Sequence, residues 1–81
     1  MRVRIRFFAS LREIVGQGEL ELDLPEGATP EDAWRRLAET YPPLTDRRRS
    51  LGAAVNRAYA TFDSRLSAGD ELVFIPPVSG G

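Results

Sequence analysis

The stretch RVRIRFF at residues 2–8 opens the chain with arginine and apolar residues in alternation. The three arginines and Phe8 fall on one face and the other apolar residues on the opposite face, which is the pattern of a half-buried strand. The stretch ELELDL at residues 19–24 repeats this pattern, with leucines on one face and acids on the other. Because the two outer faces carry opposite charges, we predict an antiparallel pair with Arg4 opposite Glu21.

Two further charge pairs follow from this register. Arg2 meets Asp23 and Arg6 meets Glu19, so that three complementary pairs line the outer face. Each exposed pair contributes little stability, but together they help to fix the register of the strands. Between the two strands, residues 11–16 suit a short helical turn that ends at its glycine.

A longer helix is predicted after the second strand. Thr29 reads as its N-cap, Pro30 occupies the first helical position, and two acids follow in the first turn. The prolines at 42–43 stop the helix, and the position of Trp34 indicates a core residue rather than a ligand-stacking one. The apolar face of this helix consists of Ala33, Trp34, Leu37, Ala38 and Tyr41.

The last strand, at residues 71–75, is apolar on both faces. Leu72 and Phe74 face one way, whereas Val73 and Ile75 face the other. A strand covered by a helix on one side should carry polar residues on the other, so Val73, Ile75 and the outward Phe8 predict an exposed apolar patch. This patch is either a docking surface near the C-terminus or a region of partial burial.

The order of the elements predicts the fold. Short strands at residues 53–55 and 59–62 stand between the helix and the last strand, which would lie centrally beside the first. The result is an α+β fold of the β-grasp type, with a mixed sheet packed on one main helix. We expect residues 1–76 to form one domain and residues 77–81 to form an extended, flexible C-terminal tail that reaches up to about 16 Å.

Composition limits the classes of function. The 81 residues contain no cysteine, histidine or lysine, which leaves no disulfide and no thiolate metal site and argues against autonomous catalysis. A net charge of −1 favours neither nucleic acid nor an anionic membrane as a partner. Since no apolar run reaches the roughly 20 residues of a membrane span and the chain opens with a strand, we expect a cytoplasmic protein. The arginines at 47–49 are interpreted as a solvated turn rather than a contact patch.

The sequence ends in Ser79, Gly80 and Gly81. Two glycines can lie fully extended in a channel too narrow for other side chains, so the Gly81 carboxylate is a candidate reactive group. A chain without thiolate, lysine amine or imidazole would suit a carrier of an activated carboxyl, because those groups would attack it most readily. A frayed terminus and a genome that favours arginine codons are the simple alternatives.

Four short stretches are distributed along the chain from residue 6 to residue 81: RFFASLREIVG at 6–16, AVN at 54–56, LSAGDE at 66–71 and FIPPVSGG at 74–81. With them the chain resembles the small subunit of molybdopterin synthase, a ubiquitin-like sulfur carrier. The closing PPVSGG is the most specific part of the resemblance.

The resemblance implies a ubiquitin-like β-grasp fold and a cycle centred on Gly81. A ubiquitin-activating-like adenylyltransferase would use ATP to adenylate the Gly81 carboxylate, and a sulfur donor, such as a cysteine desulfurase or a rhodanese-like protein, would convert it to a thiocarboxylate. The tail, with Val78, Ser79 and Gly80, would enter the large subunit of molybdopterin synthase and give sulfur to cyclic pyranopterin monophosphate in molybdenum cofactor biosynthesis. This chain would bind no cofactor or metal, and the catalytic groups would belong to the large subunit.

The resemblance also implies which residues meet the partners. Phe8, Tyr59 and Ile75 occupy the matching outward positions, Val73 lies among them by alternation, and the assembly would be a heterotetramer of two small and two large subunits. Two alternatives stay open: a carrier of sulfur for thiamine or tRNA thiolation, or a protein modifier, and a plain β-grasp interaction module with an incidental tail.

Overall fold

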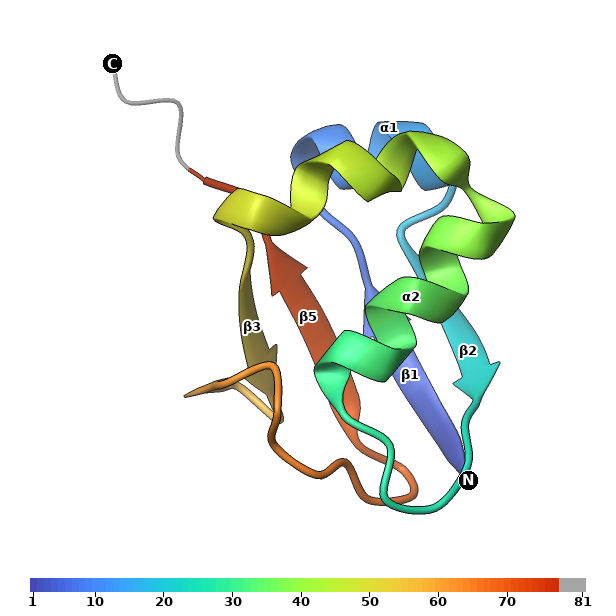
Figure 1. Cartoon of the computed structure of the whole chain (residues 1–81), viewed down its shortest axis with the longest axis vertical. Coiled ribbons are helices and arrows are strands. Elements are labelled where there is room, and N and C mark those ends of the chain that lie inside the picture. The colour runs from blue at the N-terminus through green and yellow to red at the C-terminus, as the bar shows by residue number, and fades with distance from the viewer. Residues whose placement is uncertain (78–81) are drawn as a thin grey trace.

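A computed structural model describes residues 1–77, in which five strands and three helical segments alternate along the chain (Figure 1). The predictions for Val78, Ser79, Gly80 and Gly81 concern residues outside the described part of the chain. The elements are β1 (Arg2–Arg6), α1 (Ala9–Val15), β2 (Glu19–Asp23), α2 (Pro30–Thr40), the 3₁₀ helix η1 (Pro42–Ser50), β3 (Gly52–Val55), β4 (Ala58–Ala60) and β5 (Glu71–Ile75).

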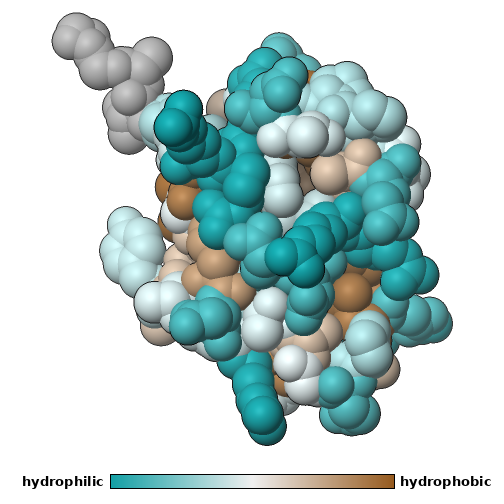
Figure 2. All heavy atoms as spheres, viewed as in Figure 1, coloured by the Kyte–Doolittle hydropathy of each residue, from teal (hydrophilic) through white to brown (hydrophobic). Residues whose placement is uncertain are grey.

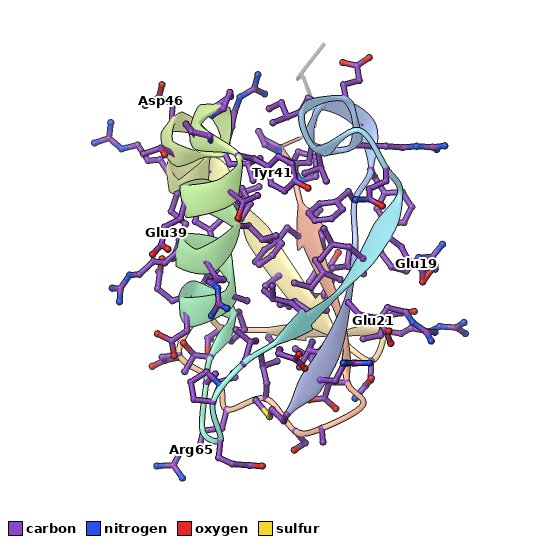
Figure 3. The ribbon with its side chains drawn as sticks, turned by 90° about the vertical axis from the view of Figure 1, so that its right-hand side faces the viewer. Glu19, Glu21, Glu39, Tyr41, Asp46 and Arg65 are labelled. Carbon is purple, nitrogen blue, oxygen red and sulfur yellow. The ribbon has the colours of Figure 1, made fainter. Side chains whose placement is uncertain are left out.

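The strands form one mixed sheet in the order β2-β1-β5-β3-β4. β5 runs parallel to β1 and antiparallel to β3, and the other pairs are antiparallel. α2 and η1 lie on one side of this sheet and α1 lies over one end of it, whereas no helix within residues 1–77 covers the opposite side (Figures 1 and 3). The predicted β-grasp fold is therefore confirmed. Within residues 1–77, neither α2 nor any other helix has the length and apolar character needed to cross a membrane.

The register of β1 and β2 is the predicted one, with Arg4 opposite Glu21. The ion pairs are formed differently, because long side chains also reach diagonal neighbours on a sheet. Arg2 pairs with Asp23 across the strands at 3.3 Å, whereas Arg4 reaches diagonally to Glu19 at 3.3 Å. Charge complementarity therefore sets the register without each arginine bonding the acid directly opposite it. Figure 3 shows the glutamates of β2 pointing away from the helices.

α2 begins and ends as predicted. The Asp32 amide donates to the Thr29 hydroxyl at 3.2 Å, and the Thr29 amide donates to the Asp32 carboxylate at 3.0 Å, which makes a capping box. The apolar face of α2 packs on the sheet, where Trp34 is 2% exposed and meets the Phe74 ring edge-on at 4.9 Å. Trp34 is therefore a core residue, as predicted.

Two strands, β1 and β4, end two residues earlier than predicted. β1 ends at Arg6, and Phe8 instead takes the N-cap position of α1 in an extended conformation. β4 ends at Ala60 rather than at Phe62, whose ring turns into the structure and stacks on Phe74 at 5.9 Å. At Phe62 the ring packs against the core, and at Phe8 the chain turns into α1; alternation records neither.

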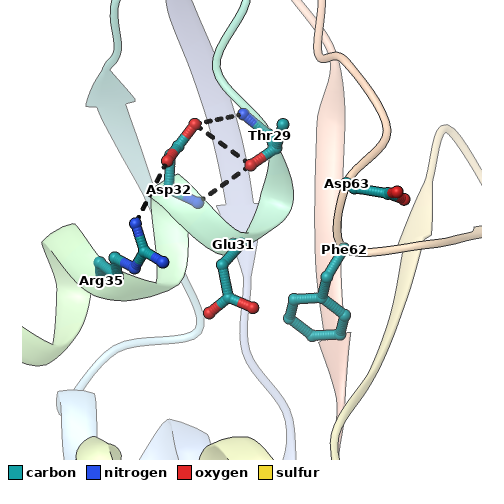
Figure 4. Close-up of a pocket in the computed structure, with 6 residues that line it drawn as sticks. All are labelled: Thr29, Glu31, Asp32, Arg35, Phe62 and Asp63. Atoms are coloured by element: carbon teal, nitrogen blue, oxygen red, sulfur yellow. Dashed lines mark hydrogen bonds and ion pairs between the residues drawn. The ribbon is translucent and has the colours of Figure 1, made fainter.

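The interpretation of residues 47–49 as a solvated turn is wrong for Arg48. These residues belong to η1, and the Arg48 guanidinium makes a two-pronged ion pair with Glu31, with contacts of 2.6 to 3.1 Å. The same guanidinium lies 3.5 Å from the centre of the Phe62 ring, which Figure 4 shows beside Glu31 at the start of α2. Arg48 thus joins η1 to α2 and to the loop before β5.

This ion pair gives the fold a testable pH dependence. The hydrogen bond from Arg48 lowers the pKa of Glu31 below its ordinary value of 4.5. A lowered pKa in the folded state means that the pair stabilises the protein at higher pH and loses this contribution as the pH falls. We expect Glu31→Gln to reduce the free energy of unfolding by about 1 kcal/mol at neutral pH.

The difference between the wild type and Glu31→Gln should shrink below about pH 4.5. Urea unfolding at several pH values measures it, with Glu39→Gln at the exposed end of α2 as the matched control. A difference between the wild type and Glu31→Gln that stays constant down to pH 3 would show that the ion pair with Arg48 contributes nothing.

Candidate functional site

The uncovered side of the sheet carries an apolar row across β5, β3 and β4, which an arginine of β1 borders. Arg6 of β1 lies opposite Val73 of β5, Val73 lies opposite Ala54 of β3, and Ala54 lies opposite Tyr59 of β4. Two residues further along β5, Ile75 lies opposite Gly52. We call Phe8, Ala54, Tyr59, Val73 and Ile75 the apolar outer face.

The residues of this face differ in exposure. Tyr59 is 90% exposed and Phe8 is 46% exposed, whereas Val73 and Ile75 are half-buried. A shallow hollow of about 260 Å³ lies between Tyr59, Ile75, Ala54 and Arg57. Val73 and Ile75 therefore form the floor of the face and Tyr59 one of its walls. The predicted partial burial is observed for Val73 and Ile75, and the docking surface stays a prediction.

Phe8 stands at the border between the apolar outer face and the arginines of β1. Its ring centre lies 5.4 Å from the guanidinium carbon of Arg6. The same guanidinium also makes an ion pair with Glu71 at 3.9 Å. The next residue, Ala9, has a φ of 49°, a left-handed conformation that is costly for alanine. The sharp turn after Phe8 leaves its side chain outside the core while Phe7 is buried.

Tyr59 owes its position to the β3–β4 hairpin. Asn56 and Arg57 have φ values of 51° and 71°, as a tight two-residue loop requires. The side-chain Nδ2 of Asn56 donates to the Asp70 carboxylate at 2.9 Å, and the backbone amide of Glu71 donates to the Asn56 side-chain oxygen at 3.0 Å. Asn56, which belongs to one of the sequence motifs, thus fastens the hairpin to the start of β5.

The chain leaves the sheet from the end of β5. Pro76 and Pro77 border a cavity of about 170 Å³ whose other walls come from α1 and from the end of η1. This places the last described residues between two helical segments and next to the apolar outer face (Figure 1). In Figure 2, hydrophobic atoms gather at the left edge, below the point where the described chain ends. The remaining walls are Ser10, Leu11, Asp46, Arg47, Ser50 and Leu51.

Sequence reasoning placed four residues on this face and missed two features. Alternation on β1 and β5 identified Phe8, Val73 and Ile75, and the family motif identified Tyr59. It missed Ala54, because Ala54 and its buried neighbour Ala53 are the same residue type, so alternation cannot tell which of them faces outward. It also missed Arg47 at the cavity beside Pro77, because only the packing of η1 brings them together. The register of β3 against β5 is the signal that could have found Ala54.

A mixed five-stranded sheet packed on one main helix, with the C-terminal strand at its centre, defines a ubiquitin-like protein of the β-grasp class. The chain belongs to the ThiS family, whose model matches residues 5–81.

Relatives match over almost their whole length. The chain is 35% identical to the molybdopterin synthase sulfur carrier subunit of Escherichia coli (strain K12), over 98% of this chain and 99% of the relative. It is 33% identical to the same subunit of Arabidopsis thaliana, over all of this chain and 84% of the relative. Among solved structures, the small archaeal modifier protein SAMP1 of Haloferax volcanii is 30% identical, with a TM-score of 0.88 over both whole chains. These likenesses confirm the predicted resemblance.

Proposed function

We propose that this chain is a sulfur carrier subunit of molybdopterin synthase. The observation that carries the proposal is the continuity of one element, since β5 contributes Val73 and Ile75 to the apolar outer face and then leads into the C-terminal Gly-Gly sequence. The full-length likeness to curated sulfur carrier subunits supports the same function.

The reacting group is the Gly81 carboxylate, which by itself is a poor acceptor for a nucleophile. An adenylyltransferase would join this carboxylate to the AMP part of ATP and release pyrophosphate. Sulfur at the oxidation level of sulfide, delivered as such or released from a persulfide by a thiol reductant, would then form the carbon–sulfur bond as AMP leaves, and the product is a thiocarboxylate. ATP would bind to the activating enzyme, and this chain needs no cofactor of its own.

The described residues supply the docking surface for this cycle. Aromatic side chains such as Phe8 and Tyr59 are the residue type that interfaces use as anchors. Tyr59 shares a hollow with Ile75, and Phe8 lies beside Arg6, which is opposite Val73 in the sheet. From Pro77, the four residues that follow span at most about 14 Å. A large subunit that binds the apolar outer face would therefore have its catalytic groups within about 14 Å of Pro77.

We further propose that the large subunit supplies the acids and bases, that the complex holds two copies of each subunit, and that the cycle runs in the cytoplasm. The acceptor of sulfur would be cyclic pyranopterin monophosphate. These points rest on the family resemblance and on the absence of histidine from the chain.

A second function, protein modification, is favoured by the likeness to a small archaeal modifier protein. The two functions share adenylation of Gly81. They differ in the nucleophile that then attacks the Gly81 carbonyl carbon, which is a sulfur atom in one function and a lysine amine in the other. Amide-linked adducts of this chain with other proteins in its own cells would support the modifier function.

Intact-protein mass spectrometry tests the shared chemistry. The purified chain is incubated with an activating enzyme, ATP and a sulfide source, and we expect the mass increase that results when one oxygen is replaced by sulfur. A chain that keeps its mass, under conditions that convert an established carrier, contradicts the proposal.

A further inference from the structure

The chain is short of groups that could attack its own activated C-terminus. All eleven of its basic residues are arginine, and it contains no cysteine or histidine. A guanidinium stays protonated in proteins and is not a nucleophile, whereas lysine amines, thiolates and imidazoles would react readily with an activated acyl group. The amino group of Met1 is the one amine that could attack, beside the hydroxyl groups of serine, threonine and tyrosine.

The Met1 amino group lies far from the place where the chain leaves the sheet. It donates a hydrogen bond of 2.6 Å to the Leu24 carbonyl, and the neighbouring Arg2 carbonyl accepts from the Gly69 amide. Pro77 follows eight residues after Gly69, which corresponds to about 25 Å along an extended strand. Figure 1 shows the N-terminus and the end of β5 at opposite ends of the sheet.

This distance exceeds the reach of the C-terminus. The four residues that follow Pro77 span at most about 14 Å, so Gly81 cannot meet the Met1 amine of its own chain. The side chains around the cavity at Pro77 include Ser10, Ser50 and Arg47. Hydroxyl groups without an adjacent base are weak nucleophiles, and arginine stands where a lysine would be within reach.

From this placement we infer that the chain excludes itself as an acceptor and passes its activated acyl group only to another molecule. The excluded reaction is the attack of an amine on the Gly81 carbonyl carbon. It forms an amide bond, AMP or a thiol leaves with the bonding electrons, and the amine loses a proton to solvent. The inference rests on the proposed function. Its consequence is that the chain forms neither a ring nor lysine-linked polymers of itself.

The test uses full-length chains with a thioester of a small thiol installed chemically on Gly81. No activating enzyme is needed, so the result does not depend on whether the carrier cycle itself is correct. The wild type is compared with Arg47→Lys, beside Pro77, and with Arg65→Lys, an exposed position at the far end of the molecule (Figure 3).

At mildly alkaline pH the wild type should only hydrolyse. Arg47→Lys should form a ring that is one water lighter than the free acid, at a rate independent of protein concentration. Since tethered groups reach millimolar effective concentrations, this should be about 100-fold faster at 10 µM protein than the coupling of Arg65→Lys between molecules.

Two results would overturn the inference. In the first, the wild type forms a ring or amide-linked pairs as fast as the lysine variants, so that a group of its own acts as an acceptor. In the second, Arg47→Lys is as slow as the wild type, so that the arginine beside Pro77 protects nothing.

Discussion

Deletion of Gly80 and Gly81 should reduce sulfur transfer to the level of a reaction without carrier, while the free energy of unfolding stays within about 0.5 kcal/mol of the wild type. The deletion removes the carboxylate that the proposed cycle activates and shortens the sequence after Pro77 by two residues. The body should fold normally, because the last buried core residue among those described is Phe74.

Molybdopterin formation with a purified large subunit measures transfer, and urea unfolding measures stability. Replacing Gly80 and Gly81 by two alanines provides the matched control, because it restores the length and the carboxylate but adds two Cβ atoms. If the side-chain-free tail matters, this control should also transfer slowly. A truncated chain with full activity would instead favour a plain interaction module with an incidental tail.

Phe8→Asp should weaken binding to the large subunit by about 10- to 100-fold, as the loss of a central aromatic anchor does in other interfaces. Its effect on stability should be small, because the ring is 46% exposed. Moreover, Phe8 is the N-cap of α1, has an extended conformation and makes no side-chain cap. Aspartate is a preferred N-cap residue, so the substitution supplies a cap that the wild type lacks.

Isothermal titration with the large subunit measures the affinity, and a thermal melt measures stability. Thr40→Asp adds the same charge at the exposed end of α2, on the helical layer, and should leave affinity unchanged. If Phe8→Asp unfolds the protein, then Phe8 is a core residue, and the apolar outer face loses one of its two exposed aromatic residues.

The parts of the fold that follow from local pattern could be predicted from the sequence. Opposite charges on two alternating strands placed Arg4 opposite Glu21, and Thr29 with Pro30 located the start of α2. Arg48 could not be predicted, because its partner Glu31 lies 17 residues away and the two meet only when η1 packs beside α2. A run of arginines has the same local pattern whether or not one of them is held in an ion pair.

The same division applies to the candidate site. Val73 and Ile75 could be predicted because β5 is apolar on both faces. A strand that is covered on one side needs apolar residues on that side only, so the second apolar face points to a surface patch. The hollow between Ile75 and Tyr59 could not be predicted, since it depends on the register of β3, where the small Ala54 lines it. Small residues mark such a hollow only when their neighbours across the sheet are known.

The central place of β5 has a mechanical consequence. β5 is hydrogen-bonded to β1 on one side and to β3 on the other. A pull on the C-terminus along the strand therefore loads both ladders in shear, so that many hydrogen bonds resist at once instead of opening one after another. An enzyme that draws the tail into its site would pull against a rigid anchor, and the force would move the whole domain before it could unravel the end of the sheet.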